Sequence, residues 1–206
     1  MAVMPMFPLG MTLLPGALLP LQVFEPRYRQ MVQDILGDDV HPPEFGVTLI
    51  ERGHEVGGGD IRSTIGTVAR IIDIQATADG GYLLAAVGTE RFRIVSWLPD
   101  DPYPLADIDL WPDEGDHHVS TAEIEALHQR VRDLNEIVRS LGEMSPPPDT
   151  EIGDDPRMAV FHLGSLSPLG AADRHAILAA PGLDVRLQAL KDALDDAEAV
   201  LEFRRS

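Results

Sequence analysis

The sequence of 206 residues contains no cysteine, and this absence removes several kinds of chemistry at once. Disulfide bonds, zinc sites with thiolate ligands, iron–sulfur clusters and cysteine nucleophiles all depend on that side chain. The lack of cysteine also leaves no sign of an oxidising compartment, so we expect a cytoplasmic protein.

Lysine is nearly as scarce, because Lys191 is the single copy. A P-loop that binds nucleotide phosphates needs a lysine after a glycine and before Ser or Thr, whereas Lys191 stands between Leu190 and Asp192. The sequence therefore has no P-loop of this form. Any chemistry that depends on lysine would have to use this one residue, which lies in a strongly helical pattern.

Long apolar runs are also missing. No run approaches the roughly 20 residues that span a bilayer. The first ten residues, MAVMPMFPLG, have no basic segment, and Pro5 and Pro8 interrupt them, so they do not resemble a signal peptide. The sequence predicts a soluble protein with no membrane partner.

Basic side chains are far fewer than acidic ones, and the formal net charge is −18. Residues 100–160 hold sixteen acidic and only four basic side chains. Such a surface repels phosphate backbones and anionic lipids, which predicts that nucleic acid is not a partner.

The sequence divides into two halves in which the apolar residues recur with different periods. Residues 1–116 contain short segments rich in β-branched and aromatic residues, typical of a small barrel or sandwich. Asp79-Gly80-Gly81 predicts a hairpin turn. One helix is expected after Pro26, because apolar residues recur on one face until Gly37. The predicted strands are 18–24, 45–51, 67–74, 81–88, 91–98 and 105–111.

Residues 117–206 predict a helical bundle. Two segments carry apolar residues at alternating steps of three and four, as in a packing seam. Packing within the chain is favoured over an intermolecular coiled coil, since short amphipathic helices usually gain stability from tertiary contacts. The expected helices are 120–142, 156–166, 170–180 and 183–203.

Motifs for catalysis are weak. The G-x-S-x-G pattern of serine hydrolases is absent. The cluster Asp113, Glu114, Asp116, His117 and His118 offers metal ligands, but neighbouring histidines on a linker rarely close a site unaided, so a solvated linker is favoured. The segment GHEVGGGD (53–60) reads as a hairpin tip that could bind a partner, rather than as a phosphate loop.

Five blocks in order carry a resemblance to a known family. They are MFPLGMTLLPGALLPLQVFEPRYRQMV, FGVTLIERGHEVGGG, IGTVARI, DGGYLLAAVGTERFRI and, more loosely, LSPLGAADRHAILAAPGLDVRLQAL. Together they resemble the amino-terminal substrate-binding domain of Lon proteases. The resemblance implies an α+β fold, in which a six-stranded PUA-like pseudobarrel with one inserted helix (1–116) precedes a helical bundle (117–206), together forming one Lon N-terminal-type domain.

The resemblance also implies a role without catalysis. The chain looks like a stand-alone bacterial Lon-domain protein, without the ATPase module or the Ser–Lys dyad, so we expect no enzyme activity and no cofactor. Its expected partners are unfolded or exposed polypeptide segments and a protease or chaperone to which it would act as adaptor. An RNA-binding PUA-like protein and a metal-dependent hydrolase remain as alternatives, and the oligomeric state is open.

The expected binding surface combines aromatic, charged and glycine-rich positions. In FEPRYR, Arg27 and Arg29 would keep Glu25 ionised, which favours a structural ion pair at a strand–helix corner. The same corner could rim a recognition surface. The candidate polypeptide-binding residues are Phe24, Glu25, Arg27, Tyr28, Glu55, Gly57, Gly58, Gly59, Arg91 and Trp97.

Overall fold

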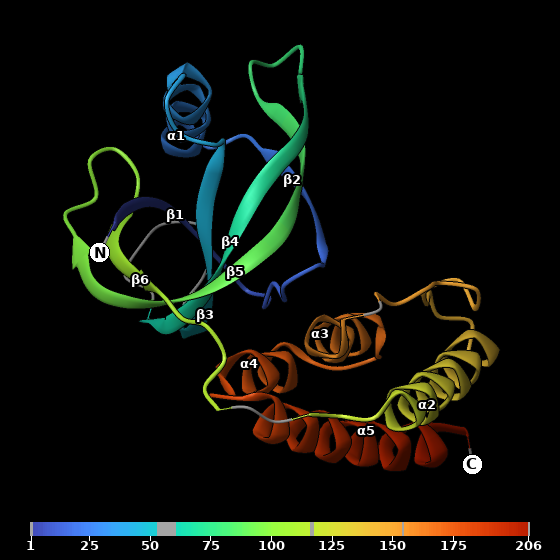
Figure 1. Ribbon diagram of the computed structural model, residues 1–206. Coiled ribbons are helices and arrows are strands. Elements are labelled where there is room, and N and C mark those ends of the chain that lie inside the picture. Colours follow the sequence, from blue (N-terminus) through green and yellow to red (C-terminus); the bar gives the residue numbers. More distant parts are fainter. Residues whose placement is uncertain (1, 53–60, 116–117, 154, 206) are drawn as a thin grey trace. The chain divides into compact units, whose positions relative to one another are not determined.

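The computed structural model describes residues 2–52, 61–115, 118–153 and 155–205. The chain divides into two compact units, a β unit (Met1–Pro112) and a helical unit (Asp113–Ser206), and each is described by itself (Figure 1). The domain division after residue 116 stays a prediction, because residues 116 and 117 lie outside the described part of the chain.

In the described residues, the β unit contains one six-stranded sheet with the order β2-β5-β4-β3-β1-β6. Because β5 also pairs with β6, five of these strands form a closed ring. Among the described strands, β2 hydrogen-bonds to β5 alone. The β1–β3 pair is parallel, and the other pairs are antiparallel. The strands are β1 (Ala2–Leu9), β2 (Leu18–Val23), β3 (Glu44–Arg52), β4 (Ile61–Ala76), β5 (Tyr82–Leu98) and β6 (Leu105–Leu110).

Strand β1 was not expected from the sequence, because Pro5 and Pro8 argue against a strand. The pairing of β1 explains why both prolines fit. Its first half pairs with β6 and its second half, from Met6 onward, pairs with β3. Each proline therefore lies where the strand is paired on one side only, and its missing N–H can face the unpaired side.

The predicted strands 81–88 and 91–98 are one continuous strand, β5. The sequence suggested a break because Gly88 lies between them. This glycine instead allows a close approach, since an added Cβ would come within 2.5 Å of the Leu14 carbonyl oxygen. The predicted hairpin turn at Asp79–Gly81 is confirmed between β4 and β5, with Gly80 at a φ of 80°.

Helix α1 (Pro26–Gly37) packs one face against the sheet of the β unit, over one end of the ring (Figure 1). Its buried residues are Tyr28, Met31, Val32 and Ile35, as the sequence period predicts. They join a core that includes Phe7, Phe45 and Leu84 from the strands. A second, smaller cluster around Met6 and Phe92 fills another part of the same unit.

Four helices of the described residues form the helical unit, and they pack on one another within the chain. In α2 the Ser120 hydroxyl caps the N-terminus by accepting from the Glu123 N–H at 3.2 Å. The predicted seams of α2 and α5 are largely buried. The helices are α2 (Thr121–Ser140), α3 (Pro156–Leu166), α4 (Ala171–Ala179) and α5 (Leu183–Arg205). Among the described residues, no helix is both long and apolar enough to cross a membrane.

Candidate functional site

The strand–helix corner of FEPRYR is held by stacked side chains. The Tyr28 ring lies parallel to the Phe7 ring, with centroids 4.0 Å apart, and only 3% of Tyr28 is exposed. The Arg27 guanidinium covers the Tyr28 ring at 4.5 Å and its Nε donates to the Glu25 carboxylate at 3.1 Å. The expected ion pair at this corner is therefore confirmed, and it fixes the start of α1.

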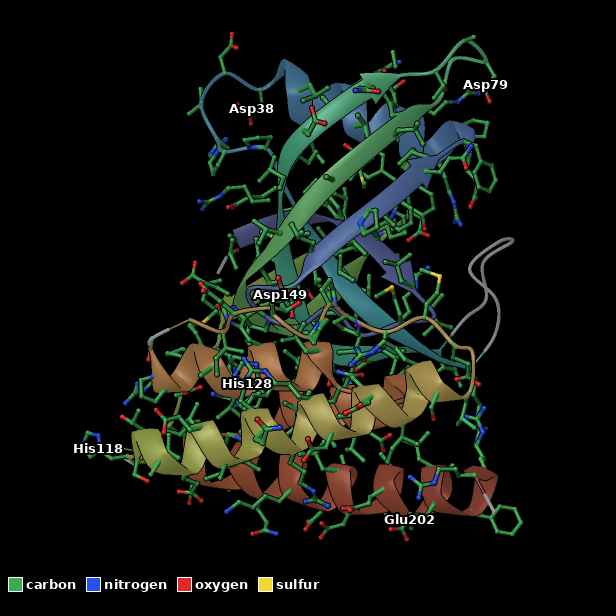
Figure 2. All side chains as sticks on the ribbon, turned by 90° about the vertical axis from the view of Figure 1, so that its right-hand side faces the viewer. Asp38, Asp79, His118, His128, Asp149 and Glu202 are labelled. Atoms are coloured by element: carbon green, nitrogen blue, oxygen red, sulfur yellow. The ribbon has the colours of Figure 1, made fainter. Side chains whose placement is uncertain are left out.

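Arg29 ties the same helix to the β4–β5 turn. Its guanidinium donates to the Gly80 carbonyl at 3.3 Å. In that turn, hydrogen bonds from the Thr77 hydroxyl and the Gly81 N–H lower the pKa of Asp79, which is labelled in Figure 2. Arg29 thus connects α1 to the β4–β5 turn, whereas Arg27 holds the corner at the start of the helix.

Phe24 is the exposed member of this corner. It is 58% exposed and borders a small cavity of about 100 Å³ between the end of β2 and α1. We call this cavity the corner pocket. Its other lining residues are Phe7, Leu9, Leu21, Gln22, Val23, Glu25 and Tyr28. The structure therefore brings together four of the predicted binding residues, Phe24, Glu25, Arg27 and Tyr28.

An apolar strip continues from this corner along β2 and β5. The residue pairs Leu18–Val87, Pro20–Ala85 and Gln22–Leu83 face each other across the two strands. Neighbours of this kind share one face of a sheet, and here it is the face opposite the core. Leu18 is 67% and Leu83 47% exposed. We call Leu18, Pro20, Leu83, Ala85 and Val87 the β2–β5 outer face.

The other predicted binding residues lie elsewhere in the β unit. Arg91 is buried, and its guanidinium lies 4.4 Å from the centroid of the Trp111 ring. Trp97 is half-buried near the far end of β5, where the Arg62 guanidinium covers its ring at 4.6 Å. Since β2 ends opposite Tyr82, the first residue of β5, Trp97 lies at the other end of this strand from Phe24. Glu55, Gly57, Gly58 and Gly59 lie outside the described residues.

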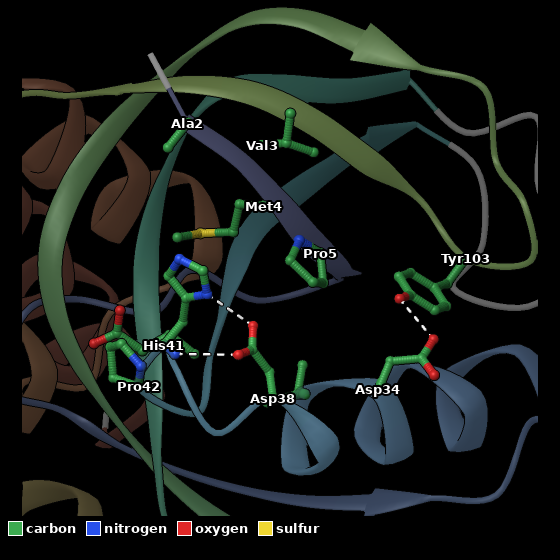
Figure 3. Close-up of a pocket in the computed structure, with 11 residues that line it drawn as sticks. Ala2, Val3, Met4, Pro5, Asp34, Asp38, His41, Pro42 and Tyr103 are labelled. Atoms are coloured by element: carbon green, nitrogen blue, oxygen red, sulfur yellow. Dashed lines mark hydrogen bonds and ion pairs between the residues drawn. The ribbon is translucent and has the colours of Figure 1, made fainter.

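A larger cavity of about 580 Å³, the β1 pocket, lies between β1 and α1 (Figure 3). Ala2–Pro5 of β1 form one wall, and the α1 residues Asp34, Ile35 and the following Asp38 form the other. Tyr103 lies at one end and His41 at the opposite end. Pro42 and Glu44 complete the lining.

Charge in the β1 pocket is held in place by short-range hydrogen bonds. The Val40 N–H, followed by the His41 side chain and N–H, donates to Asp38 and lowers the pKa of that carboxyl. Burial, together with the hydrogen bond to Asp34 at 2.9 Å and the charge of Asp34, raises the pKa of Tyr103 to about 12. At neutral pH Asp38 is therefore ionised. The Tyr103 hydroxyl stays protonated and donates a hydrogen bond to Asp34.

The described residues give the metal hypothesis little support. The Asp113 carboxylate accepts two hydrogen bonds from the fully buried Arg186 guanidinium, one of them at 2.9 Å. His118 is exposed (Figure 2). Among the residues that the structure describes, no group of three or more His, Asp or Glu side chains could hold a metal ion. Asp116 and His117 lie outside them.

The single lysine is engaged in the helical unit. Lys191 of α5 contacts the Glu123 carboxylate of α2 through Nζ at 2.6 Å. A lysine in a proteolytic dyad would instead deprotonate a serine hydroxyl. This contact therefore assigns Lys191 to the packing of α5 on α2.

Comparison with known families decides the classification. The model of the family described as the ATP-dependent protease La (LON) substrate-binding domain matches residues 3–196. The chain belongs to the Lon substrate-binding domain family. This confirms the resemblance found in the sequence, and the family supports neither the RNA-binding nor the metal-dependent alternative.

Curated proteins named Lon protease are among the relatives of this chain. Lon protease 2 of Myxococcus xanthus is 28% identical over 212 residues, which cover 98% of this chain and 24% of the relative. Lon protease of Anaeromyxobacter dehalogenans is 27% identical over 213 residues, with the same two coverages. The chain thus spans about a quarter of the length of these relatives.

Solved structures agree with the family. The crystal structure of a Lon N-terminal domain protein from Xanthomonas campestris superimposes with a TM-score of 0.66 at 27% identity, covering 93% of this chain and 98% of that one. The N-terminal domain of the Mycobacterium avium complex Lon protease gives a TM-score of 0.58 at 19% identity, with coverages of 95% and 99%. The second likeness concerns the fold alone.

Sequence reasoning did not find the β1 pocket. Asp34 and Asp38 look like ordinary polar positions of an amphipathic helix and its end, and Tyr103 is separated from Asp34 by 69 residues. The apolar run of residues 2–9 is a signal for strand β1, because prolines are tolerated where a strand is paired on one side only.

Proposed function

We propose that this member of the Lon substrate-binding domain family captures extended, apolar polypeptide segments without catalysing their cleavage. The observation that carries this proposal is the β2–β5 outer face. It is an exposed apolar strip at a strand, β2, that pairs on one side only within the part of the sheet that the structure describes. A polypeptide can add to such an edge through main-chain hydrogen bonds while its apolar side chains contact the neighbouring face. Exposed apolar patches on folded domains commonly mark interaction sites.

The corner pocket extends the proposed surface. Phe24 and the apolar side chains around it would receive one side chain of the captured segment, next to the end of β2. Arg27 and Glu25 neutralise each other here, which suits an uncharged ligand. Pro20 has no N–H, so the free edge of β2 is interrupted and would favour short segments over open-ended pairing of strands.

Two finer features belong to the same proposal. We take the closed ring of strands to be the PUA-like pseudobarrel of the family and the four packed helices to be its helical bundle. The absence of enzymatic activity rests on the missing P-loop and on Lys191, whose ammonium contacts Glu123. Delivery of the captured segment to a protease or chaperone stays a prediction.

A binding titration tests the proposal. A fluorescently labelled, permanently unfolded polypeptide with apolar residues and no net charge is titrated with the chain, and its anisotropy is followed. The double variant Leu18→Ser/Leu83→Ser should weaken binding about tenfold or more, since two exposed apolar contacts are lost. The matched control is Val95→Ser, because Val95 lies on the same β5 strand and is 52% exposed.

Two results would contradict the proposal. Unchanged affinity of the double variant would remove the β2–β5 outer face from the binding site. Cleavage of the polypeptide that persists through repurification, with or without ATP, would show that the chain is an enzyme.

A further inference from the structure

Among the described strands of the β unit, the first half of β1 is paired along one edge only. Ala2–Pro5 pair with β6, whereas the pairing of β1 with β3 begins only at Met6. The Met6 N–H donates to the Pro104 carbonyl, just before β6. Because main-chain groups point to alternate sides along a strand, the N–H and C=O of Val3 face away from β6. The C=O of Pro5 also faces away from β6, but it belongs to the β1–β3 pairing, which begins with Met6 opposite Gly46. That side is where the β1 pocket lies.

The pocket has the form of a groove between a strand and a helix. Figure 3 shows Ala2–Pro5 along one wall and Asp34 and Asp38 on the opposite wall. Its volume of about 580 Å³ falls within the range of roughly 300–1,000 Å³ typical of ligand sites. Val3, 59% exposed, and Ile35 give the groove an apolar component.

The charge of the groove has one sign. Its lining residues include the carboxylates of Asp34, Asp38 and Glu44 but no lysine or arginine, and His41 is the one residue among them that can become a cation. Glu44 is already paired with Arg70 at 2.7 Å. Asp34 accepts from Tyr103 and Gln30, which leaves further lone pairs, because a carboxylate offers about four acceptor positions.

We propose that the β1 pocket binds an extended polypeptide segment in which arginine or lysine stands next to an apolar residue. The segment adds as a strand to the free edge of Ala2–Pro5, and its cationic side chain reaches Asp34 and Asp38 across the groove. Charge-assisted hydrogen bonds to these carboxylates supply specificity, and main-chain hydrogen bonds to the N–H and C=O of Val3 supply the register. This inference rests on the proposed function, since it names a substrate class for a second site of the same unit.

The carboxylates are tested first. An eight-residue labelled peptide in which arginine alternates with valine is titrated against the whole chain. The double variant Asp34→Asn/Asp38→Asn keeps the size of both side chains and should weaken binding about tenfold or more. The control Glu90→Gln/Glu136→Gln removes two charges at exposed positions outside the groove and should change affinity less than about twofold. If both double variants lose the same amount of affinity, the overall charge of the protein explains the effect and the proposal is overturned.

The strand edge is tested separately. Val3→Pro removes the N–H that faces the groove, while the neighbours Ala2 and Met4 keep theirs for β6. We expect about three- to tenfold weaker binding of the arginine peptide, because one main-chain hydrogen bond is lost. Val3→Ala keeps the N–H and serves as the control, and far-UV circular dichroism confirms that both variants fold. If Val3→Pro binds as tightly as Val3→Ala, strand addition at β1 is wrong.

The arms of the experiment separate the two sites. The β1 pocket is supported as a distinct site if Asp34→Asn/Asp38→Asn no longer binds the arginine peptide but still binds the uncharged polypeptide normally. If the uncharged polypeptide fails to bind the unmodified chain while the arginine peptide binds and depends on Asp34 and Asp38, the β2–β5 site fails and the β1 site stands. If N-acetyl-arginine amide competes at the same concentration as the peptide, the pocket binds a single cation and the polypeptide proposal is overturned.

Discussion

The β unit and the helical unit differ in what their ion pairs connect. In the β unit Arg27–Glu25 lies within one corner and Arg70–Glu44 joins two neighbouring strands, while most of the core is apolar. In the helical unit the fully buried Arg186 is paired with Asp113 and lies 3.8 Å above the Phe161 ring centroid. Further ion pairs join the helices there, among them Lys191–Glu123 and Arg130–Asp195.

This difference bears on where binding can occur. Sheet hydrogen bonds and apolar packing hold the β unit together, so it can leave a strand edge and two cavities open without losing its core. In the helical unit the ion pairs bind the helices to one another, which makes those charges unavailable to a ligand. We therefore place both proposed binding sites in the β unit and assign a structural role to the ion pairs of the helical unit.

Breaking the buried ion pair should give the largest effect on stability. Asp113→Ala leaves the Arg186 guanidinium buried without its carboxylate partner, and such a change costs about 3–5 kcal/mol. Urea unfolding followed by far-UV circular dichroism reports it, because four of the helices in the described residues belong to the helical unit.

The control removes both charges. Asp113→Leu/Arg186→Met replaces the pair by apolar side chains and should recover most of the lost free energy of unfolding. A circular dichroism midpoint of Asp113→Ala equal to that of the unmodified chain would show that the buried pair is not what distinguishes the helical unit.

A substitution at Gly66 should be next in size and should act on the β unit. A Cβ at this position would meet the Val47 carbonyl oxygen and Cζ of Phe92, so the sheet must shift to accommodate it. Overpacking of this kind costs about 1–3 kcal/mol. Intrinsic fluorescence measures the effect, since the two tryptophans of the sequence, Trp97 and Trp111, both lie in the β unit.

Gly37→Ala is the matched control for Gly66→Ala, because nothing lies within 4 Å of a Cβ added at Gly37. Its fluorescence midpoint should equal or slightly exceed that of the unmodified chain. Similar losses for both substitutions would mean that helix or strand propensity, rather than close packing at Gly66, governs the result.

The two units also differed in how far the sequence predicted them. In the helical unit a helix follows the period of its own residues, so the expected seams matched buried residues such as Leu127, Val131 and Leu190. In the β unit the hairpin at Gly80 and the face of α1 were local signals and were found. The closed ring, by contrast, depends on pairings between distant strands, such as β1 with β6, that no local pattern encodes.

The candidate sites divide in the same way. The cluster of Phe24, Glu25, Arg27 and Tyr28 lies within five consecutive residues, so one motif was enough to point to it. The β1 pocket joins residues from β1, α1 and the loop that contains Tyr103. Such a site arises from tertiary packing, and neither Asp34 nor Tyr103 stands in a sequence motif that would mark it.

A smaller effect is expected at the start of α2. Ser120→Ala removes the hydroxyl that accepts from the Glu123 N–H, which should cost about 1 kcal/mol. Ser120→Asp keeps an acceptor and should stay within a few tenths of a kcal/mol of the unmodified chain. Urea unfolding followed by circular dichroism compares the two. A loss in both variants would assign the effect to something other than the cap.

The last prediction concerns the ionisation of Tyr103 in the β1 pocket, which has the smallest effect on stability at neutral pH. Its pKa is raised from an ordinary 10 to about 12, first by burial and then by the hydrogen bond to Asp34. The folded state therefore holds this proton more tightly than the unfolded chain. The stabilisation is complete below pH 10 and is lost as the pH rises through about 12.

Absorbance of tyrosinate measures this directly, as the difference between the unmodified chain and Tyr103→Phe. Between pH 10 and about 11 the difference should show a protonated phenol. In Asp34→Asn the same ionisation should begin at lower pH, because the negative charge that opposes it has been removed. A phenol at position 103 that ionises at its ordinary pKa would mean that Asp34 and Tyr103 do not face each other across a partly dry groove. The acidic wall of the β1 pocket would then need another explanation.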